Sequence, residues 1–233
     1  MNGVHDLGGR DGLGAIDPTP AEPVWKAEWE KHAHALFPLG FRAGFFGVDA
    51  FRFGMELIEP VEYLTSTYYE HWVHAVEHHG VAHGTLDKAE IERRTQYYLE
   101  HPDEPLPDKQ DPTLVEFISA VIPAGATAAR ETDKVAAFAI GDVVTVNADA
   151  PHGHTRRAGY VRGRTGKIIL AHGTMIYPDT AGNGLGEAPE HVYTVLFTNT
   201  ELWGSEAAEP NGTVTFDVWE PYITLAAAKE TAA

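Results

Sequence analysis

The sequence predicts an α+β protein with helices in its first half and short strands in its second half. Two changes of pattern along the 233 residues support this class. Up to Val121, apolar residues recur at the three- and four-residue spacing of one helix face. From Phe138 onward, β-branched runs alternate with Gly, Pro, Asn and Asp, as strands alternate with turns. Apolar residues make up 43% of the chain, so it can bury a sizeable core.

The first 24 residues are expected to form an extended arm rather than a helix or strand. Glycine and proline are too frequent over residues 1–24 for regular structure. Val4, Leu7, Leu13 and Ile16 are apolar residues within this arm. They favour an arm that lies on another chain over one that is fully solvated.

Five helices are predicted between the arm and the strands. Helical spacing places the first over 27–37, and Pro38 is expected to end it. Asp49 is the expected N-cap of the second, which Pro60 stops. The others are expected over 66–82, 85–100 and 113–121. In the helix over 66–82, the side chains expected to face inward are Tyr69, Trp72, Val73 and Val76. Together the helices define an α-helical domain over residues 25–130, with a proline-rich connector at 101–112.

The strands are expected at 141–146, 160–170, 191–197 and 213–219. Short strands at this close spacing are typical of a small barrel. The glycine-punctuated stretch at 141–169 is similar to the SH3-like barrels of some ribosomal and translation proteins. We therefore predict an SH3-like β-barrel domain over residues 131–233.

Composition excludes several classes of function. The formal charge of -17 disfavours non-specific binding to nucleic acid and to anionic membranes. The sequence has neither a membrane-spanning apolar run nor a signal peptide, so we expect a cytoplasmic protein with no membrane partner. It contains no cysteine, which excludes disulfides, thiolate metal ligands and a cysteine nucleophile.

Two clusters of polar residues leave alternatives open. Five basic residues and no acidic one lie between 156 and 167, and they form either a solvated face, a contact with an acidic partner or a set of donors for one anion. His74 and His78, like His79 and His83, have the four-residue spacing of a helical chelate. Because no third ligand is placed by sequence, a partly solvated helix face is the simpler interpretation of these histidines.

Arg52 fits an ordinary amphipathic helix less well than its neighbours do. It stands between Phe51 and Phe53, where an apolar side chain is expected, and Glu56 follows four residues later. One interpretation is a surface ion pair with Glu56 worth about 0.3–0.5 kcal/mol. The other is an arginine at the edge of an apolar pocket, where its planar donors can hold an oxyanion.

Short motifs along nearly the whole chain resemble one family, the β subunit of nitrile hydratase. They include Met1-Asn-Gly-Val-His-Asp, Phe51-Arg-Phe-Gly-Met-Glu, Tyr68-Tyr-Glu-His-Trp, Gly153-His-Thr-Arg, Tyr160-Val-Arg-Gly-Arg-Thr-Gly and Trp219-Glu-Pro-Tyr. Their order and coverage make the resemblance specific. It implies hydration of a small-molecule nitrile to an amide by a complex in which this chain is inactive alone.

The resemblance also implies where the metal lies. A non-haem Co(III) or Fe(III) centre is expected on cysteines of a partner α subunit, two of them oxidised to sulfinic and sulfenic forms, so this chain binds no metal itself. The N-terminal half is more similar to cobalt-type than to iron-type relatives. The expected assembly is an αβ heterodimer that pairs into α2β2.

Individual residues receive roles from the same resemblance. Arg52 and Arg156 are expected to donate hydrogen bonds to the oxidised sulfur oxygens, and Tyr68 to orient the nucleophile or relay a proton. The expected substrate pocket is lined by Phe37, Val48, Phe51 and Trp72. Outer positions that tune the metal are expected at Glu56, His71 and His154. Val48 is shorter than the leucine typical of that position, which implies a roomier pocket.

Three alternatives remain at this stage. A thiocyanate hydrolase has a related centre but splits the equivalent of this chain in two, so the continuous 233 residues count against it. A non-catalytic SH3-like module that binds RNA or protein would explain the β-rich half. A His-rich metal carrier would bind cobalt or zinc through His74 and His78.

Overall fold

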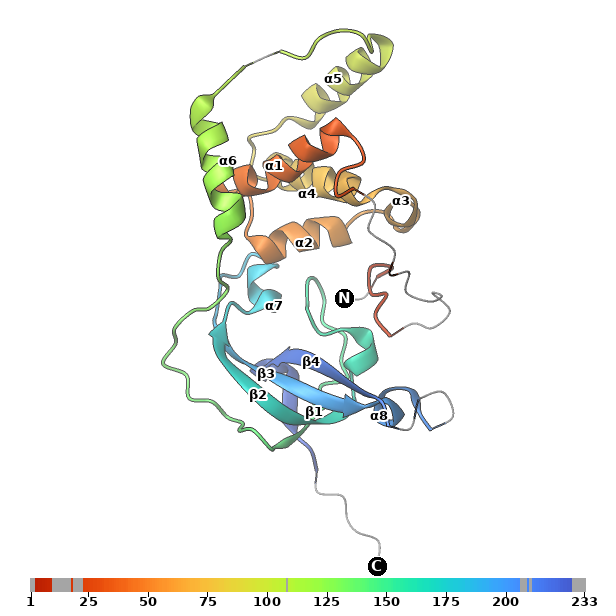
Figure 1. The fold of residues 1–233 in the computed structure, drawn as a ribbon, viewed down its shortest axis with the longest axis vertical. Helices are drawn as coiled ribbons and strands as arrows, with labels where there is room; N and C mark the ends of the chain where they lie inside the picture. The colour runs from red at the N-terminus through yellow and green to blue at the C-terminus, as the bar shows by residue number, and fades with distance from the viewer. Residues whose placement is uncertain are drawn as a thin grey trace, which may run out of the picture. The chain divides into compact units, whose positions relative to one another are not determined.

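The structure is a computed structural model that describes residues 3–9, 18, 23–107, 109–205, 209 and 211–227. The chain divides into two compact units, one formed by residues 15–126 and the other by residues 127–233 together with 1–14. The described part of the first is helical, and the second contains the sheet (Figure 1). The predicted α+β class is therefore confirmed. Most of the predicted arm at 1–24 lies outside the described residues.

The helical unit contains the five predicted helices and one more. They are α1 Glu28–Arg42, α2 Val48–Glu56, α3 Pro60–Thr65, α4 Tyr68–Ala82, α5 Lys88–Glu100 and α6 Pro112–Ala124. Side chains cap several N-termini, where backbone N–H groups lack helical partners. The Asp87 carboxylate accepts from the Glu90 N–H in α5, and the Asp111 carboxylate accepts from the Thr113 N–H in α6.

Two helix boundaries differ from the prediction, and α3 was not predicted. Helix α1 continues through Pro38 to Arg42. A proline inside a helix costs a hydrogen bond, but Pro38 and Gly40 are buried, so packing outweighs that local cost. Helix α2 begins after Gly47, and Asp49 lies inside it rather than at its cap. Pro60 follows the end of α2, as predicted, but it is also the first residue of α3. Its missing N–H is tolerated at that position.

The core of the helical unit lies where α4 packs against α1 and α2 (Figure 1). Its buried members are Phe46, Phe51, Ala75 and Val76, with Phe37, Met55 and Trp72 packed against them. Val73, predicted to face inward, is instead exposed, while Ala75 is fully buried. The small Ala75 allows α2 and α4 to approach closely at this level.

The second unit is built on one antiparallel sheet. Its strands are β1 Val143–Val146, β2 Thr165–Met175, β3 Glu190–Thr198, β4 Thr213–Trp219 and β5 Ile223–Leu225, in the order β4-β3-β2-β1-β5. Short helical turns connect them: η1 Gly159–Val161, α7 Pro178–Ala181, α8 Asn199–Trp203 and η2 Glu220–Tyr222. Four of the strands were predicted, and β5 was missed because three residues carry too short a pattern.

The pairings of the described strands form an open sheet. Strand β4 pairs along its length with β3, β5 pairs with β1, and no β4–β5 pairing is found among these strands. The closed SH3-like barrel is therefore not confirmed. The core of the unit lies against this sheet and includes Val144, Val146, Ile168, Val195 and Phe197, all fully buried. Val144 and Val146 show the period-two alternation of a half-buried strand, since Val143 is exposed.

A short part of the predicted arm packs on its own unit. The Asp6 carboxylate accepts a hydrogen bond from the Gly159 N–H, at 2.9 Å. Gly8 and Gly9 lie against the Tyr160 ring, where a Cβ would be only 2.9 Å and 2.6 Å from ring or β-carbon atoms. The N-terminal segment 3–9 is thus held by the turn η1.

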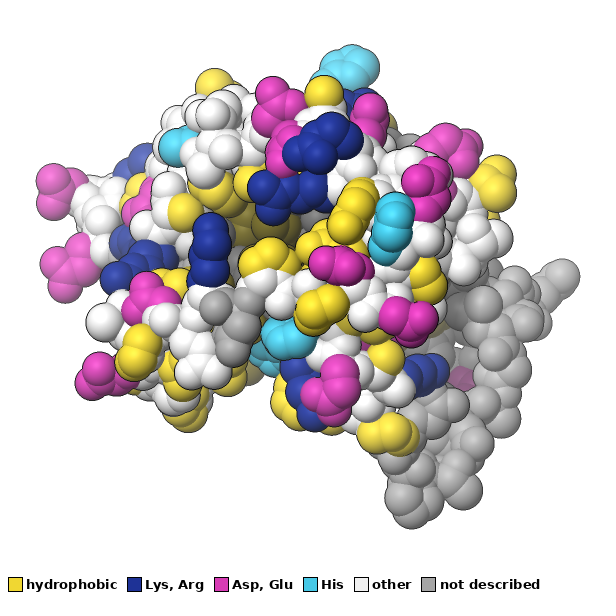
Figure 2. Space-filling view, turned by 90° about the horizontal axis from the view of Figure 1, so that it is seen from above, with side chains coloured by type: hydrophobic (Ala, Val, Ile, Leu, Met, Phe, Trp, Pro, Cys, Tyr) yellow, Lys and Arg dark blue, Asp and Glu magenta, His cyan; other side chains and the backbone are white. Residues whose placement is uncertain are grey.

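Large apolar side chains remain exposed on several helices. Val61 in α3, Leu99 in α5 and Val115 in α6 are each more than 60% exposed, and none of these helices has a buried residue. On the face in Figure 2, apolar side chains lie scattered among acidic and basic ones. No helix in the described part of the chain is long and apolar enough to cross a membrane.

Candidate functional site

An aromatic cluster at the junction of α1, α2 and α4 brings together three of the predicted pocket residues. The ring of Phe51 lies 4.6 Å from that of Phe37 and 5.2 Å from that of Trp72, measured between centroids. Phe37 and Trp72 are themselves 5.1 Å apart. Phe51 is 3% exposed. These edge and tilted contacts make a rigid apolar wall.

Arg52 and Val48 stand on α2 beside this wall. Because Phe51 is buried, the helix turns the next residue toward the rim, and the Arg52 side chain is 43% exposed. Its Nη1 donates to Oδ1 of Asp49, at 3.2 Å, and the Asp49 side chain is only 8% exposed. Val48 is one helical turn before Phe51 and is 38% exposed. The buried carboxylate of Asp49 therefore orients the guanidinium of Arg52.

Tyr68 lies at the start of α4, one turn before Trp72. The Tyr68 side chain is 64% exposed, and its ring packs against that of Trp72 with centroids 5.6 Å apart. The indole Nε1 of Trp72 is buried and has no acceptor among the described residues. Tyr68 therefore belongs to the same cluster as the wall, and most of its side chain is exposed.

His71 contacts Tyr63 of α3, and the charge of Glu56 acts on the same tyrosine. The His71 imidazole stacks on the Tyr63 ring at 4.4 Å, and its Nε2 donates to the Tyr63 carbonyl at 3.0 Å. Burial, followed by the negative charge of Glu56, raises the pKa of the Tyr63 phenol. The two predicted outer residues of the helical unit are thus linked through α3.

Arg156 lies in the second unit, on the loop before η1. Its backbone N–H donates to the Tyr222 hydroxyl at 3.1 Å, and the Thr155 hydroxyl donates to the same oxygen at 3.2 Å. The Tyr222 hydroxyl in turn donates to Oδ2 of Asp179. Burial raises the pKa of the Asp179 carboxyl and that of the Tyr222 phenol. The loop that carries Arg156 is therefore anchored by a chain of buried and partly buried hydrogen bonds.

His154 is fully buried two residues before Arg156. The side-chain amide of Asn183 accepts from the His154 N–H at 3.0 Å and donates to the His154 carbonyl at 3.1 Å. Gly182 lies against the imidazole, since a Cβ there would be 2.5 Å from His154 Cδ2. Asn183 and Gly182 thus hold the His154 backbone and ring in one position.

The basic segment 156–167 does not form one uniform patch. Arg157 is 4% exposed, and its Nη1 and Nη2 donate to the two carboxylate oxygens of Asp149, at 3.0 Å and 2.8 Å. Arg162 donates from Nε and Nη2 to the Arg157 carbonyl. Arg164 and Lys167 are exposed. Two members therefore support the loop, and the solvated-face interpretation fits only the last two.

The histidines of α4 serve different contacts. His79 Nε2 donates to the carbonyl of Ala50 in α2 at 2.7 Å, and burial lowers the pKa of this imidazole. His83 Nδ1 lies 2.9 Å from the Thr85 hydroxyl. Across the described ranges, no group of three His, Asp or Glu side chains has the arrangement of a metal site.

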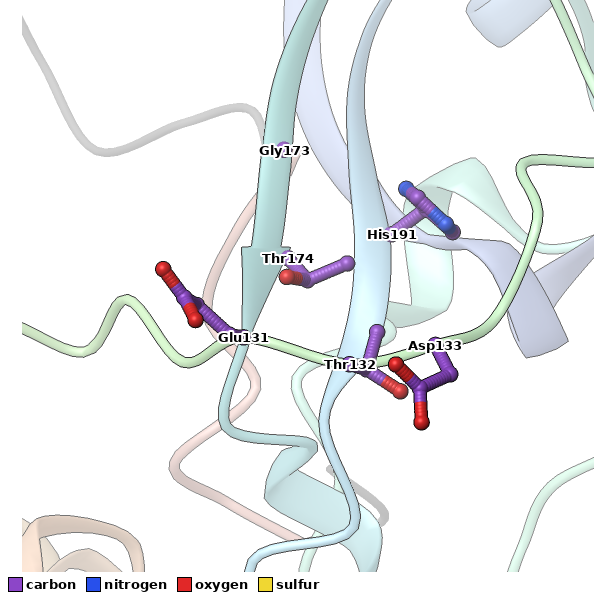
Figure 3. A pocket seen from close by; sticks show the side chains of 6 residues that line it. All are labelled: Glu131, Thr132, Asp133, Gly173, Thr174 and His191. Atoms are coloured by element: carbon purple, nitrogen blue, oxygen red, sulfur yellow. The ribbon is translucent and has the colours of Figure 1, made fainter.

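A hollow of about 440 Å³ lies in the second unit (Figure 3). Glu131, Thr132 and Asp133 line it from the segment that crosses β2 and β3, Gly173 and Thr174 line it from β2, and His191 lines it from β3. His191 Nε2 donates to the Lys134 carbonyl at 2.8 Å. None of the predicted site residues lines this hollow.

Several residues that hold the predicted site residues or their helices in place were not identified from the sequence. Asp49 stands three residues before Arg52, a spacing that does predict a helical ion pair, but it was assigned as a cap. Tyr222 and Asp179 are separated by 43 residues and approach only in the fold. His79 was considered only as half of a chelate, and no local pattern reveals its contact with Ala50.

Comparison with known proteins covers both units. Residues 1–115 match the family model for the N-terminal part of the nitrile hydratase β subunit, and residues 127–225 match the model for its C-terminal part. A nitrile hydratase subunit β of Rhodococcus sp is 56% identical over the full length of both chains. The cobalt-containing nitrile hydratase subunit β of Pseudonocardia thermophila is also 56% identical over the full length of both.

More distant proteins are also similar. The nitrile hydratase subunit β of Rhodococcus erythropolis is 33% identical, over 97% of this chain and 100% of the relative. A solved apo-enzyme structure of thiocyanate hydrolase from Thiobacillus thioparus covers 53% of this chain and 100% of that chain, with 22% identity and a TM-score of 0.37.

The chain is an α+β protein, and these matches identify it as a subunit of a hydro-lyase. The chain belongs to the nitrile hydratase β-subunit family. It is therefore a subunit of an enzyme that converts nitriles to amides, and its family implies an α subunit as partner. The family selects the enzyme-subunit hypothesis over the binding module and the metal carrier.

Proposed function

We propose that this chain completes the nitrile-binding pocket over a metal centre held by the α subunit. The observation that carries the proposal is the position of Arg52, half-exposed on α2 directly after the buried Phe51. An arginine at the rim of an apolar wall can reach an anionic group of a partner where little water competes. The bond to Asp49 uses one of the five N–H groups of a guanidinium, so the planar fork can serve a second acceptor.

Each unit contributes one arginine to this role. Arg52 and Arg156 donate to the oxygens of the partner's oxidised cysteine ligands, where a planar fork holds two oxygens and a lysine cannot. Asp49 orients Arg52, and Tyr222 holds the backbone of Arg156. Loss of either fork leaves anionic oxygens without donors, which is costly in a dry site.

The metal belongs to the partner and not to this chain. The relatives named as cobalt-containing favour cobalt over iron in the complex. The described side chains of this subunit offer no ligand cluster that would compete for it. When bound, a trivalent ion supplies Lewis-acid activation of the nitrile or of water.

The residues of this chain then bind and orient the substrate. Phe37, Phe51 and Trp72 pack around the R group of the nitrile, and Val48 sets the width at the rim. Tyr68 presents its phenol to the reacting water and orients it or relays its proton. Glu56, His71 and His154 act one layer further out, through Tyr63 and through the loop of Arg156. The wall excludes water, so that the arginine hydrogen bonds are strong.

The exposed apolar helices support a large interface with the α subunit. Helices α3, α5 and α6 carry side chains such as Val61, Leu99 and Val115 that nothing in the described chain covers fully. Apolar surface of this kind marks protein contacts. We assign these helices to the α-subunit contact within an α2β2 assembly.

The test is co-expression with a nitrile hydratase α subunit in cobalt medium, followed by acrylonitrile hydration assays. The variants Arg52→Lys and Arg156→Lys should each lower turnover on the order of a hundredfold or more while the complex still assembles. Arg164→Lys is the matched control, because this side chain is exposed. A stable metal-loaded complex with full activity in both test variants would refute the arginine role. Failure of the native pair to associate would refute the pocket-completing function.

A further inference from the structure

The two helices that carry most of the proposed site are joined by a side chain that has no role so far. Helix α2 carries Val48, Phe51 and Arg52, and α4 carries Tyr68 and Trp72. His79 lies two turns after Trp72 on α4, and its Nε2 is 2.7 Å from the Ala50 carbonyl of α2. A carbonyl can only accept, so Nε2 is the protonated nitrogen of this imidazole.

The fit at this crossing leaves no spare room. A Cβ on Gly54 would lie 2.9 Å from His79 Nε2 and 3.1 Å from the Cβ of Ala75, which is fully buried. The His79 ring also packs edge-on against Phe46, with centroids 5.5 Å apart. The imidazole thus contacts both a glycine of α2 and an aromatic ring of the core. A longitudinal slide of α2 would break the hydrogen bond and the packing together.

Ala50 is well placed to transmit such a slide. It stands between Asp49, which orients Arg52, and Phe51, which forms the wall against Trp72. Because a helix moves as a stiff rod over one or two turns, a shift at Ala50 moves the wall of α2 relative to α4. A change at His79 therefore reaches the proposed substrate wall without touching substrate.

We propose that His79 is a positioning residue for nitrile specificity: its hydrogen bond to Ala50, seated over Gly54, sets the register of α2 against α4 and so the width of the apolar wall. This inference rests on the proposed function, since it takes Phe51, Val48 and Trp72 as the substrate wall. Its ligand class is the R group of the nitrile, small and aliphatic against large and aromatic. The group at position 79 must donate from the place of Nε2, which glutamine can do and leucine cannot.

The experiment measures kcat and KM of the assembled complex for acrylonitrile and for benzonitrile. His79→Leu should shift the ratio of kcat/KM about tenfold toward benzonitrile, through a change in KM. The reason is that α2 loses its hydrogen bond to α4, so the wall can widen. His79→Gln should restore most of the native ratio. Gly54→Ala should shift the ratio in the same direction, because its Cβ pushes α2 and α4 apart. His78→Gln is the matched control, an exposed neighbour on the same helix, and should leave the ratio unchanged.

The outcomes separate this inference from the proposed function. A uniform loss of kcat for both nitriles, or an unchanged ratio in an active His79→Leu complex, would overturn the positioning role. Should His79→Leu fail to assemble, Gly54→Ala and His79→Gln decide the question: the inference requires a shifted ratio in the first and a near-native ratio in the second. Full activity of Arg52→Lys would refute the arginine role alone, because the ratio in the His79 variants reports on the wall.

Discussion

The hydroxyl of Tyr222 donates to the half-buried carboxylate of Asp179 and at the same time accepts a hydrogen bond from the backbone N–H of Arg156, at 3.1 Å. One oxygen thus connects η2, the start of α7 and the loop before η1. The guanidinium of Arg157 also lies over the Tyr222 ring, 5.4 Å from its centroid. The position of Arg156 therefore depends on residues far away in the sequence.

Tyr222→Phe tests this dependence. The change removes the acceptor of the Arg156 and Thr155 donors and the donor to Asp179, so the free energy of unfolding should fall by about 1–3 kcal/mol. In the assembled enzyme, kcat should fall roughly tenfold or more, because a displaced Arg156 no longer meets its acceptor. Thermal unfolding and acrylonitrile turnover measure the two effects. Native turnover in Tyr222→Phe would contradict the prediction.

Phe51→Ala tests the aromatic wall as a core element. Phe51 is 3% exposed and packs against Phe37, Phe46 and Trp72. Its removal should leave a cavity and destabilise the chain by about 3–5 kcal/mol, seen as a lower unfolding midpoint in denaturant. Val135→Ala, at a position 89% exposed, should cost no more than about 0.5 kcal/mol. Equal effects of the two changes would show that Phe51 is not a core residue.

Val48→Leu tests the width of the rim. The extra methylene should narrow the entrance beside Phe51, so kcat/KM should fall about tenfold for benzonitrile and change little for acrylonitrile. Val48 is 38% exposed, so the stability of the chain should hardly change. Equal losses for the two nitriles would argue against a selective role. The shift runs opposite to that expected of His79→Leu, which makes the pair a joint check on the wall.

Acid should weaken the helical unit through His79. Burial holds the pKa of this imidazole below its usual range, so the unfolded chain binds a proton at a higher pH than the folded one. Stability from this group is therefore present above the unfolded pKa of about 6.5 and is lost as the pH falls through the folded pKa. The unfolding midpoint of the complex should fall more steeply below pH 6.5 for the native protein than for His79→Gln. Parallel curves for the two proteins would refute this assignment.

The helices show how far local patterns reach. Asp87 and Asp111 cap α5 and α6 through contacts within three residues, so their starts follow from sequence. The end of α1 does not, because Pro38 and Gly40 are buried and this packing outweighs the local cost of proline. Strand β5 was likewise missed, because it is a strand only through its pairing with β1. That partner lies about eighty residues earlier in the sequence.

The candidate site, like the fold, was predicted from the sequence only in part. Sequence alone determined the family, through motifs that recur in order along the chain, and with it the candidate roles of Arg52, Arg156 and Tyr68. Only the tertiary structure decided what holds them: Asp49 beneath Arg52, Tyr222 behind Arg156 and His79 between α4 and α2. The physical reason is that chemistry requires particular residue types, which a sequence displays directly. Position depends on contacts between distant segments, which no local spacing encodes.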